Sequence, residues 1–212
     1  MTEMRPRRAA LIVLSAVLLT AAACSKDKKE TPTTTSAPTT TSTEATTTTV
    51  ALTKESIVLA PDGLGTLTFG TNAARTINLL MQALGQPEKN TPLPVGTPCG
   101  ATRRLTWGNF QVLLNEVGAS SGAGKPGFAG WFLGATSPNK LDFKTEKGIT
   151  IGSTVAALKA AYGADVTVAA RGEQGPGFTV SVPKGILLGL LDSANDTGKI
   201  KNIQSGSYCG AA

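Results

Sequence analysis

Residues 65–85 read GTLTFGTNAARTINLLMQALG, and residues 148–163 read GITIGSTVAALKAAYG. These two stretches decide the fold, because both follow one plan. Each opens with alternating apolar and polar residues, which is typical of a strand, and then turns at a glycine. A hydroxyl residue follows as a candidate helix N-cap, and apolar residues then recur at helical spacing up to a closing glycine. The sequence therefore predicts a strand, a turn and a helix twice, with the helices over residues 72–84 and 155–162.

Strand signals follow each predicted helix. After the first, residues 104–107 and 110–117 flank the tight turn Gly108-Asn109 and predict a hairpin, and residues 128–133 predict a third strand. After the second, strands are predicted over residues 166–170, 178–182, 185–191 and 200–205. A helix followed by antiparallel strands, twice over, indicates an α+β domain of two tandem helix-plus-sheet units, at about residues 56–134 and 141–209. We expect the helices to pack on one face of the sheet.

The helix motif carries a resemblance to known families. The string Gly152-Ser153-Thr154, Val155, Leu158 and Tyr162-Gly163, with Leu84-Gly85-Gln86-Pro87, resembles the opening helix of BamE-type small lipoproteins, the SmpA/OmlA family. It is also similar to the tandem-repeat β-lactamase-inhibitory proteins. That second resemblance implies paired units that form a concave sheet, and a protein-binding function.

The N-terminus has the order of an export signal. Three arginines precede the apolar run 9–19, and the small residues 21–23 stand directly before Cys24. This is the layout of a signal peptide, and the apolar run is too short to cross a bilayer. A cysteine after the small triplet resembles the bacterial lipobox of secreted lipoproteins, including those of actinobacteria. The resemblance implies removal of residues 1–23 and a diacylglycerol, with palmitate-type acyl chains, on the Cys24 sulfur.

A Thr/Ser-rich segment separates Cys24 from the domain. Residues 31–49 hold 14 Ser or Thr in 19 positions and no large apolar side chain. Such a segment buries too little surface to offset its ordering entropy, so residues 24–50 are predicted to be a disordered linker. Residues 51–212 remain as one globular domain, which is long enough for a substantial core.

The three cysteines are predicted to have two different roles. With Cys24 assigned to the lipid, Cys99 and Cys209 remain, and an even remainder in an oxidising cell envelope indicates a disulfide. Two buried free thiols are the alternative. The bond would close a loop of about 110 residues, for which the chain-entropy model gives about 4–5 kcal/mol of stabilisation.

Composition excludes several functional classes. The chain contains no histidine, which removes Ser-His-Asp and Cys-His catalysis and the commonest zinc ligand. Residues 51–212 hold 14 Lys or Arg against 10 Asp or Glu, without a basic stripe, so nucleic-acid binding is not expected. We expect no enzyme activity, no metal and no cofactor.

Aromatic residues gather in the first predicted unit. Simple alternation over residues 128–133 places Phe128 and Phe132 on one face, the core, and Trp131 on the other. An exposed Trp131, with Trp107, Arg103 and Arg104, is predicted to form a protein-binding surface, and packing of the tryptophans under a loop is the alternative.

These features predict a non-catalytic envelope lipoprotein, anchored by lipid to the extracytoplasmic face of the cell membrane, that binds or scaffolds another envelope protein. The alternative is a carrier of a lipid or other small ligand, in which the apolar stretch 185–191 lines a pocket.

Overall fold

The computed structural model describes residues 51–94, 96–97, 99–116 and 126–207. The chain divides after residue 47, and all described residues lie in the unit that spans residues 48–212. The predicted signal peptide, Cys24 and the predicted linker lie outside the described residues, as does Cys209. The Cys99 sulfur lies 3.5 Å from the Thr97 hydroxyl oxygen, and its disulfide with Cys209 stays a prediction.

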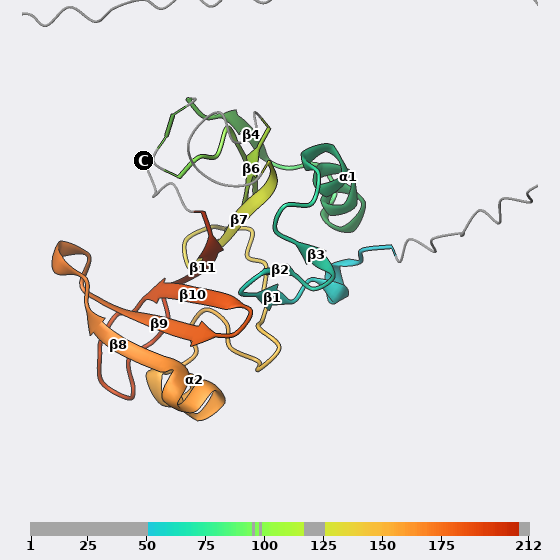
Figure 1. The fold of residues 1–212 in the computed structure, drawn as a ribbon. Helices are drawn as coiled ribbons and strands as arrows, with labels where there is room; N and C mark the ends of the chain where they lie inside the picture. The colour runs from blue at the N-terminus through green and yellow to red at the C-terminus, as the bar shows by residue number, and fades with distance from the viewer. Residues whose placement is uncertain (1–50, 95, 98, 117–125, 208–212) are drawn as a thin grey trace, which may run out of the picture. The chain divides into compact units, whose positions relative to one another are not determined.

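The described residues form a mixed α+β domain with two α-helices and two antiparallel sheets (Figure 1). Three short 3-10 helices also occur among the described residues, at Lys54–Ser56, Gly163–Asp165 and Gly172–Gln174. The helices and strands are, in chain order, β1 Leu59–Ala60, β2 Gly63–Leu64, β3 Leu67–Thr68, α1 Ala73–Leu84, β4 Lys89–Pro92, β5 Arg103–Trp107, β6 Phe110–Asn115, β7 Gly127–Gly134, α2 Val155–Tyr162, β8 Val166–Ala170, β9 Pro176–Val182, β10 Gly185–Leu190 and β11 Asn202–Gly206.

The larger sheet has eight strands in the order β4-β5-β6-β7-β11-β10-β9-β8, and every neighbouring pair is antiparallel. Figure 1 shows β11 between β7 and β10. The chain therefore builds one half of the sheet, crosses to the far edge, and returns strand by strand until β11 meets β7. The smaller sheet, β1-β2-β3, has strands of two residues each.

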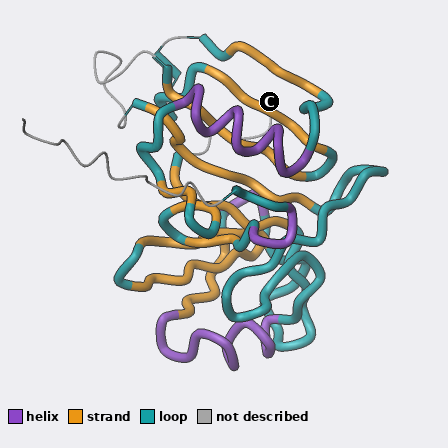
Figure 2. The backbone as a smooth tube through the Cα atoms, turned by 90° about the vertical axis from the view of Figure 1, so that its right-hand side faces the viewer, coloured by secondary structure: helices purple, strands orange, loops and turns teal. Residues whose placement is uncertain are grey.

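One face of the eight-stranded sheet forms the core. Side chains of β5 to β7 and of β9 to β11 on this face are buried, those of β8 are half-buried, and they pack with Leu80 of α1 and with Val155 and Leu158 of α2. Figure 2 shows α1 lying along the strands of its half of the sheet. Helix α1 contacts β7 and α2 contacts β8, and buried side chains of both helices belong to the core on this one face, as the sequence predicted.

The two helices begin and end as their sequences predict, with one difference. The hydroxyl of Thr154 accepts from the Ala157 N–H at 3.1 Å, but the cap of α1 is the side chain of Asn72, which accepts from Arg75. Gly85 and Gly163 follow the last helical residues at φ +78° and +58°, a backbone region that favours glycine.

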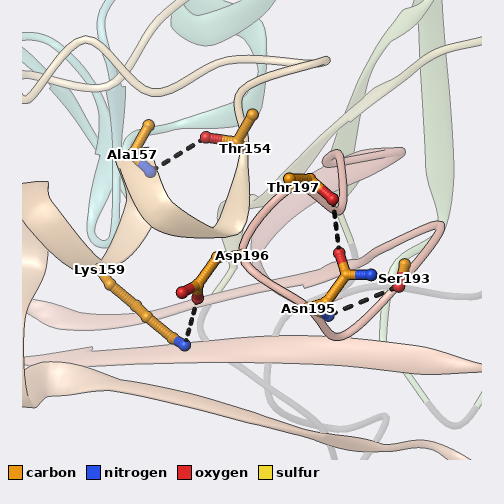
Figure 3. A network of polar contacts seen from close by, with 7 residues as sticks. All are labelled: Thr154, Ala157, Lys159, Ser193, Asn195, Asp196 and Thr197. Atoms are coloured by element: carbon orange, nitrogen blue, oxygen red, sulfur yellow. Dashed lines mark hydrogen bonds and ion pairs between the residues drawn. The ribbon is translucent and has the colours of Figure 1, made fainter.

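The loop 192–198 completes the N-terminus of α2 (Figure 3). The first N–H groups of the helix donate to carbonyls of this loop, Val155 N to Gly198 O at 2.8 Å and Ala156 N to Asp196 O at 3.0 Å. The Asp196 carboxylate pairs with Lys159 at 2.8 Å across exposed surface. Since the loop satisfies N–H groups that an isolated helix leaves unpaired, it joins α2 to the strand β11 that follows.

Both tryptophans belong to the core face, which corrects the prediction that they are exposed. Trp131 is 0% exposed and Trp107 is 4% exposed. Their indole N–H groups donate to backbone carbonyls of the covering layer, Trp131 Nε1 to Ala60 O and Trp107 Nε1 to Gly85 O, each at 3.0 Å. These two bonds tie β1 and the end of α1 onto the sheet.

The short strand predicted over residues 149–151 is wrong, because residues 149 and 150 have no regular secondary structure and Ile151 begins a turn. Its alternating apolar residues still point inward: Ile149 is buried, and Ile151 packs against the core. Backbone bonds from Gly152 and Thr145 hold this turn in place without a strand partner along its length.

We expect Trp131→Ala to lower the free energy of unfolding by about 3–5 kcal/mol, because it leaves a cavity and an unpaired Ala60 carbonyl. The neighbouring change Phe132→Ala removes a half-buried ring from the other face and is expected to cost about 1 kcal/mol. Urea unfolding of both variants tests this. Equal losses in stability would contradict the assignment of the two side chains to opposite faces.

Candidate functional site

The candidate site is the face of the eight-stranded sheet that points away from the helices, here called the open face. Strand register places one side chain from every strand in a continuous row across it, here called the cross-strand row. At a strand spacing of about 4.8 Å the row spans about 34 Å. Its members, in order from β4 to β8, are Lys89, Thr106, Gln111, Phe132, Gln204, Leu188, Thr179 and Thr167.

The cross-strand row is accessible along its whole length. Its two end members, Lys89 and Thr167, are exposed, and the six between them are half-buried. Phe132 stands in the centre between Gln111 and Gln204. An aromatic ring flanked by amides and hydroxyls is typical of protein-binding surfaces, where apolar contact supplies affinity and polar groups at its margin fix the orientation.

The charged side chains that the strands themselves place on the open face are cationic. The eight strands contain Lys89, Arg103 and Arg104, and no Asp or Glu. Arg104 lies on the open face, because its neighbours Leu105 and Arg103 point to the core side. At the other end Arg171, just after β8, places its Nη2 3.0 Å from Phe178 O and 2.9 Å from the Thr179 hydroxyl oxygen. Cations therefore stand at both ends of the row, and the field favours a negatively charged partner.

A hollow adjoins the row at β10. It has a volume of about 620 Å³, and its apolar walls include Phe69, Ile186 and Leu188. Asp62 and Lys184 also line it. Ile186 is 50% exposed. Among the described residues it is the one large apolar side chain that is exposed. Such a hollow can accept an apolar side chain of a partner, the arrangement in which one residue contributes much of the binding energy.

Of the four residues predicted as a binding surface, only Arg104 lies on the open face. Trp107 and Trp131 are core residues. Arg103 points to the core side of β5 and pairs with Glu116 at 3.1 Å, where both side chains are about one-third exposed. The predicted surface of four residues is therefore wrong: three of its members lie on the opposite side of the sheet.

A β-bulge explains the error. The register between β6 and β7 shifts between Leu113 and Leu114, so that Leu113 pairs with Gly130 and Leu114 with Phe128. Ala129 is the extra residue, and it moves Trp131 onto the face of Phe128 and Phe132 onto the other. Simple alternation therefore assigned Trp131 and Phe132 to the wrong faces of the sheet. The sequence signal was Gly130, because a glycine inside a strand often marks a bulge or a close backbone approach.

The apolar stretch 185–191 contributes to both faces. Leu187 and Leu191 are buried in the core, whereas Ile186 and Leu188 line the hollow of the open face. A second, smaller hollow of about 300 Å³ lies beside α2, and Leu59, Tyr162, Val182 and Pro183 are among its lining residues. Burial raises the pKa of the Tyr162 hydroxyl, against a hydrogen bond with Thr145 that lowers it. The Lys147 ammonium lies 5.3 Å from the centre of this ring.

Within the described ranges, no three His, Cys, Asp or Glu side chains gather closely enough to bind a metal ion. Asp142 and Glu146, two carboxylates four residues apart in the sequence, are both exposed. No helix among the described residues has the length and apolarity to cross a membrane.

Comparison with known proteins gives no relative: no protein-family model, no curated protein and no solved structure matches this chain.

Proposed function

We propose that this chain is a membrane-anchored envelope lipoprotein whose domain binds another protein through its open face. The observation that carries the proposal is the cross-strand row: eight aligned positions, an aromatic centre, an adjoining apolar hollow and cations at both ends. The partner is an envelope protein with an acidic surface. The domain acts by binding and has no catalytic function.

The domain is further proposed to consist of two copies of one unit. Each helix is followed by four strands, β4 to β7 after α1 and β8 to β11 after α2. The sheet order runs through the first set forward and through the second set in reverse, so the last strands of the two sets pair. This plan is the one implied by the resemblance to tandem-repeat β-lactamase-inhibitory proteins. It also explains why the row is long, since two sheets laid edge to edge share one face.

The partner surface can be tested with variants of the row. Gln111→Ala, Phe132→Ala and Gln204→Ala, combined, remove the central side chains without touching the core face. Cross-linking on native membranes followed by recovery of the chain should return one dominant partner, and the triple variant should recover at least about tenfold less of it. Gln82→Ala, the same type of change on an exposed position of α1, is the matched control.

Full recovery of every partner by the triple variant would contradict the assignment of binding to the open face. Loss of the partner in Gln82→Ala as well would also contradict it, because that residue lies on the helical side.

The membrane anchor is proposed to be a diacylglycerol on Cys24, on a stalk formed by residues 26–50. Two acyl chains hold a protein firmly to a bilayer, whereas one chain holds it weakly. A flexible stalk of 25 residues reaches about 25–30 Å, which lifts the domain above the lipid head groups.

Metabolic labelling with palmitate tests the anchor. We expect label in the wild-type chain and none in Cys24→Ser, which should also leave the membrane fraction. Cys99→Ser controls for loss of a cysteine as such and should keep the label. Label retained in Cys24→Ser would overturn the assignment.

Carriage of a small apolar ligand is the second candidate, and the hollow lined by Phe69, Ile186 and Leu188 is the observation that favours it. Native mass spectrometry of detergent-extracted protein separates the two functions. A carrier retains a co-purifying ligand, which Leu188→Gln should release, whereas a scaffold shows the mass of the acylated chain alone.

A further inference from the structure

The two edges of the eight-stranded sheet differ in their protection. Strand β4 forms one edge and carries Lys89 and Pro92, two residue types that discourage the addition of a further strand. Strand β8 forms the other edge and reads Val166-Thr-Val-Ala-Ala170, without a charge or a proline. Among the described residues no strand pairs with the outer side of β8. This edge is therefore open to another extended chain.

The hydrogen bonds of β8 show which of its backbone groups point outward. Arg171 N donates to Gly175 O of the β8–β9 hairpin at 2.7 Å. In an antiparallel pair this direction alternates along the strand, so Thr167 and Ala169 also bond towards β9. The N–H and C=O groups of Val166, Val168 and Ala170 consequently point away from the sheet.

We propose that a second copy of this chain adds to this edge, with β8 antiparallel to β8 about a two-fold axis at Val168. In this register Val168 meets Val168 of the second copy, and Val166 meets Ala170. The outward-pointing residues of each copy thus oppose one another, as a hydrogen-bonded pair requires, and they form about six backbone hydrogen bonds. The two sheets become one continuous sheet.

Charge complementarity at the ends of β8 supports a second copy as the occupant. Asp165 lies three residues before Val168, and Arg171 lies three residues after it. Continued one residue beyond each end of β8, the same register brings Asp165, the last residue of the 3-10 helix Gly163–Asp165, opposite Arg171 of the other copy, twice in the dimer. Asp165 is exposed, whereas the Arg171 guanidinium reaches back over β9 and bonds to Phe178 O and the Thr179 hydroxyl, so the pair between copies requires Arg171 to exchange these bonds for the Asp165 carboxylate. Antiparallel self-pairing brings these opposite charges together without any like-charge contact within β8.

The proposal does not depend on the proposed partner of the open face. Dimerisation uses the outer backbone groups of β8 together with Asp165 and Arg171, whereas partner binding uses the central side chains of the cross-strand row; Arg171 is the residue that both proposals name. An experiment that rules out the dimer therefore does not rule out partner binding, and the reverse also holds. The dimer would place the two open faces side by side, because β8 belongs to the sheet that carries both.

Sedimentation equilibrium of the full chain in density-matched detergent tests the dimer. We expect a reversible dimer for the wild type. Ala170→Pro removes one outward N–H per copy and keeps the bonds to β9, so it should weaken association about tenfold. Asn90→Pro is the matched control, since Leu93 N bonds to Thr102 O across β4 and β5 and the alternation places the Asn90 N–H on the outer side of β4. It should leave association unchanged.

Charge reversal tests the register. Asp165→Arg alone and Arg171→Asp alone each create two like-charge contacts and should weaken the dimer about tenfold. The double variant restores opposite charges in both places and should associate within about threefold of the wild type. Circular dichroism confirms that each variant is folded.

Three results would overturn the proposal: a monomeric wild type, association equally strong in Ala170→Pro, or a folded double variant that associates no better than the single ones. Association that is insensitive to every β8 variant would instead place the contact in another segment of the chain.

Discussion

The antiparallel pairing of β7 with β11 is the interaction on which the rest of the domain depends. Five residue pairs, from Gly130–Gly206 to Gly134–Asn202, join the last strands of the two halves. Glycine is required where they meet: a Cβ on Gly130 would lie 2.1 Å from Ser207 O, and Gly206 has a φ of +73°. Without this β7–β11 pairing, here called the seam, the chain would form two separate four-stranded sheets, each with an additional exposed edge.

The seam gives the sheet two faces of opposite character. On one face Trp131, beside β11, donates its indole N–H to Ala60, and the Ser205 hydroxyl lies 2.6 Å from Pro61 O, so the β1–β2 turn is held over the joint. On the other face Phe132 and Gln204 meet across the same joint and form the centre of the cross-strand row. The buried tryptophan and the accessible phenylalanine are neighbours in sequence, and the seam assigns them opposite roles.

Local signals in the sequence predicted the local elements well. Helix α2 and strand β8 have the predicted bounds, and the hairpin at Gly108-Asn109 is present, because caps, tight turns and periodicity are properties of neighbouring residues. The bulge at Ala129 reversed the faces of β7, and strands β1 to β3 are too short to produce a period. The order of the eight strands depends on pairing between residues about 70 positions apart, which no local pattern encodes. Of the predicted protein-binding surface only Arg104 lies on the open face, and the pocket-lining alternative for residues 185–191 included Ile186 and Leu188; the row itself exists only after the strands are aligned.

Hydrogen exchange of the backbone amides tests the central claim most directly. A single continuous sheet predicts that the amides bonded across β7 and β11 are among the slowest to exchange, and that both halves of the sheet open together at the free energy of global unfolding. Rapid exchange at this seam, with the α1 and α2 halves opening at separate free energies, would contradict the account.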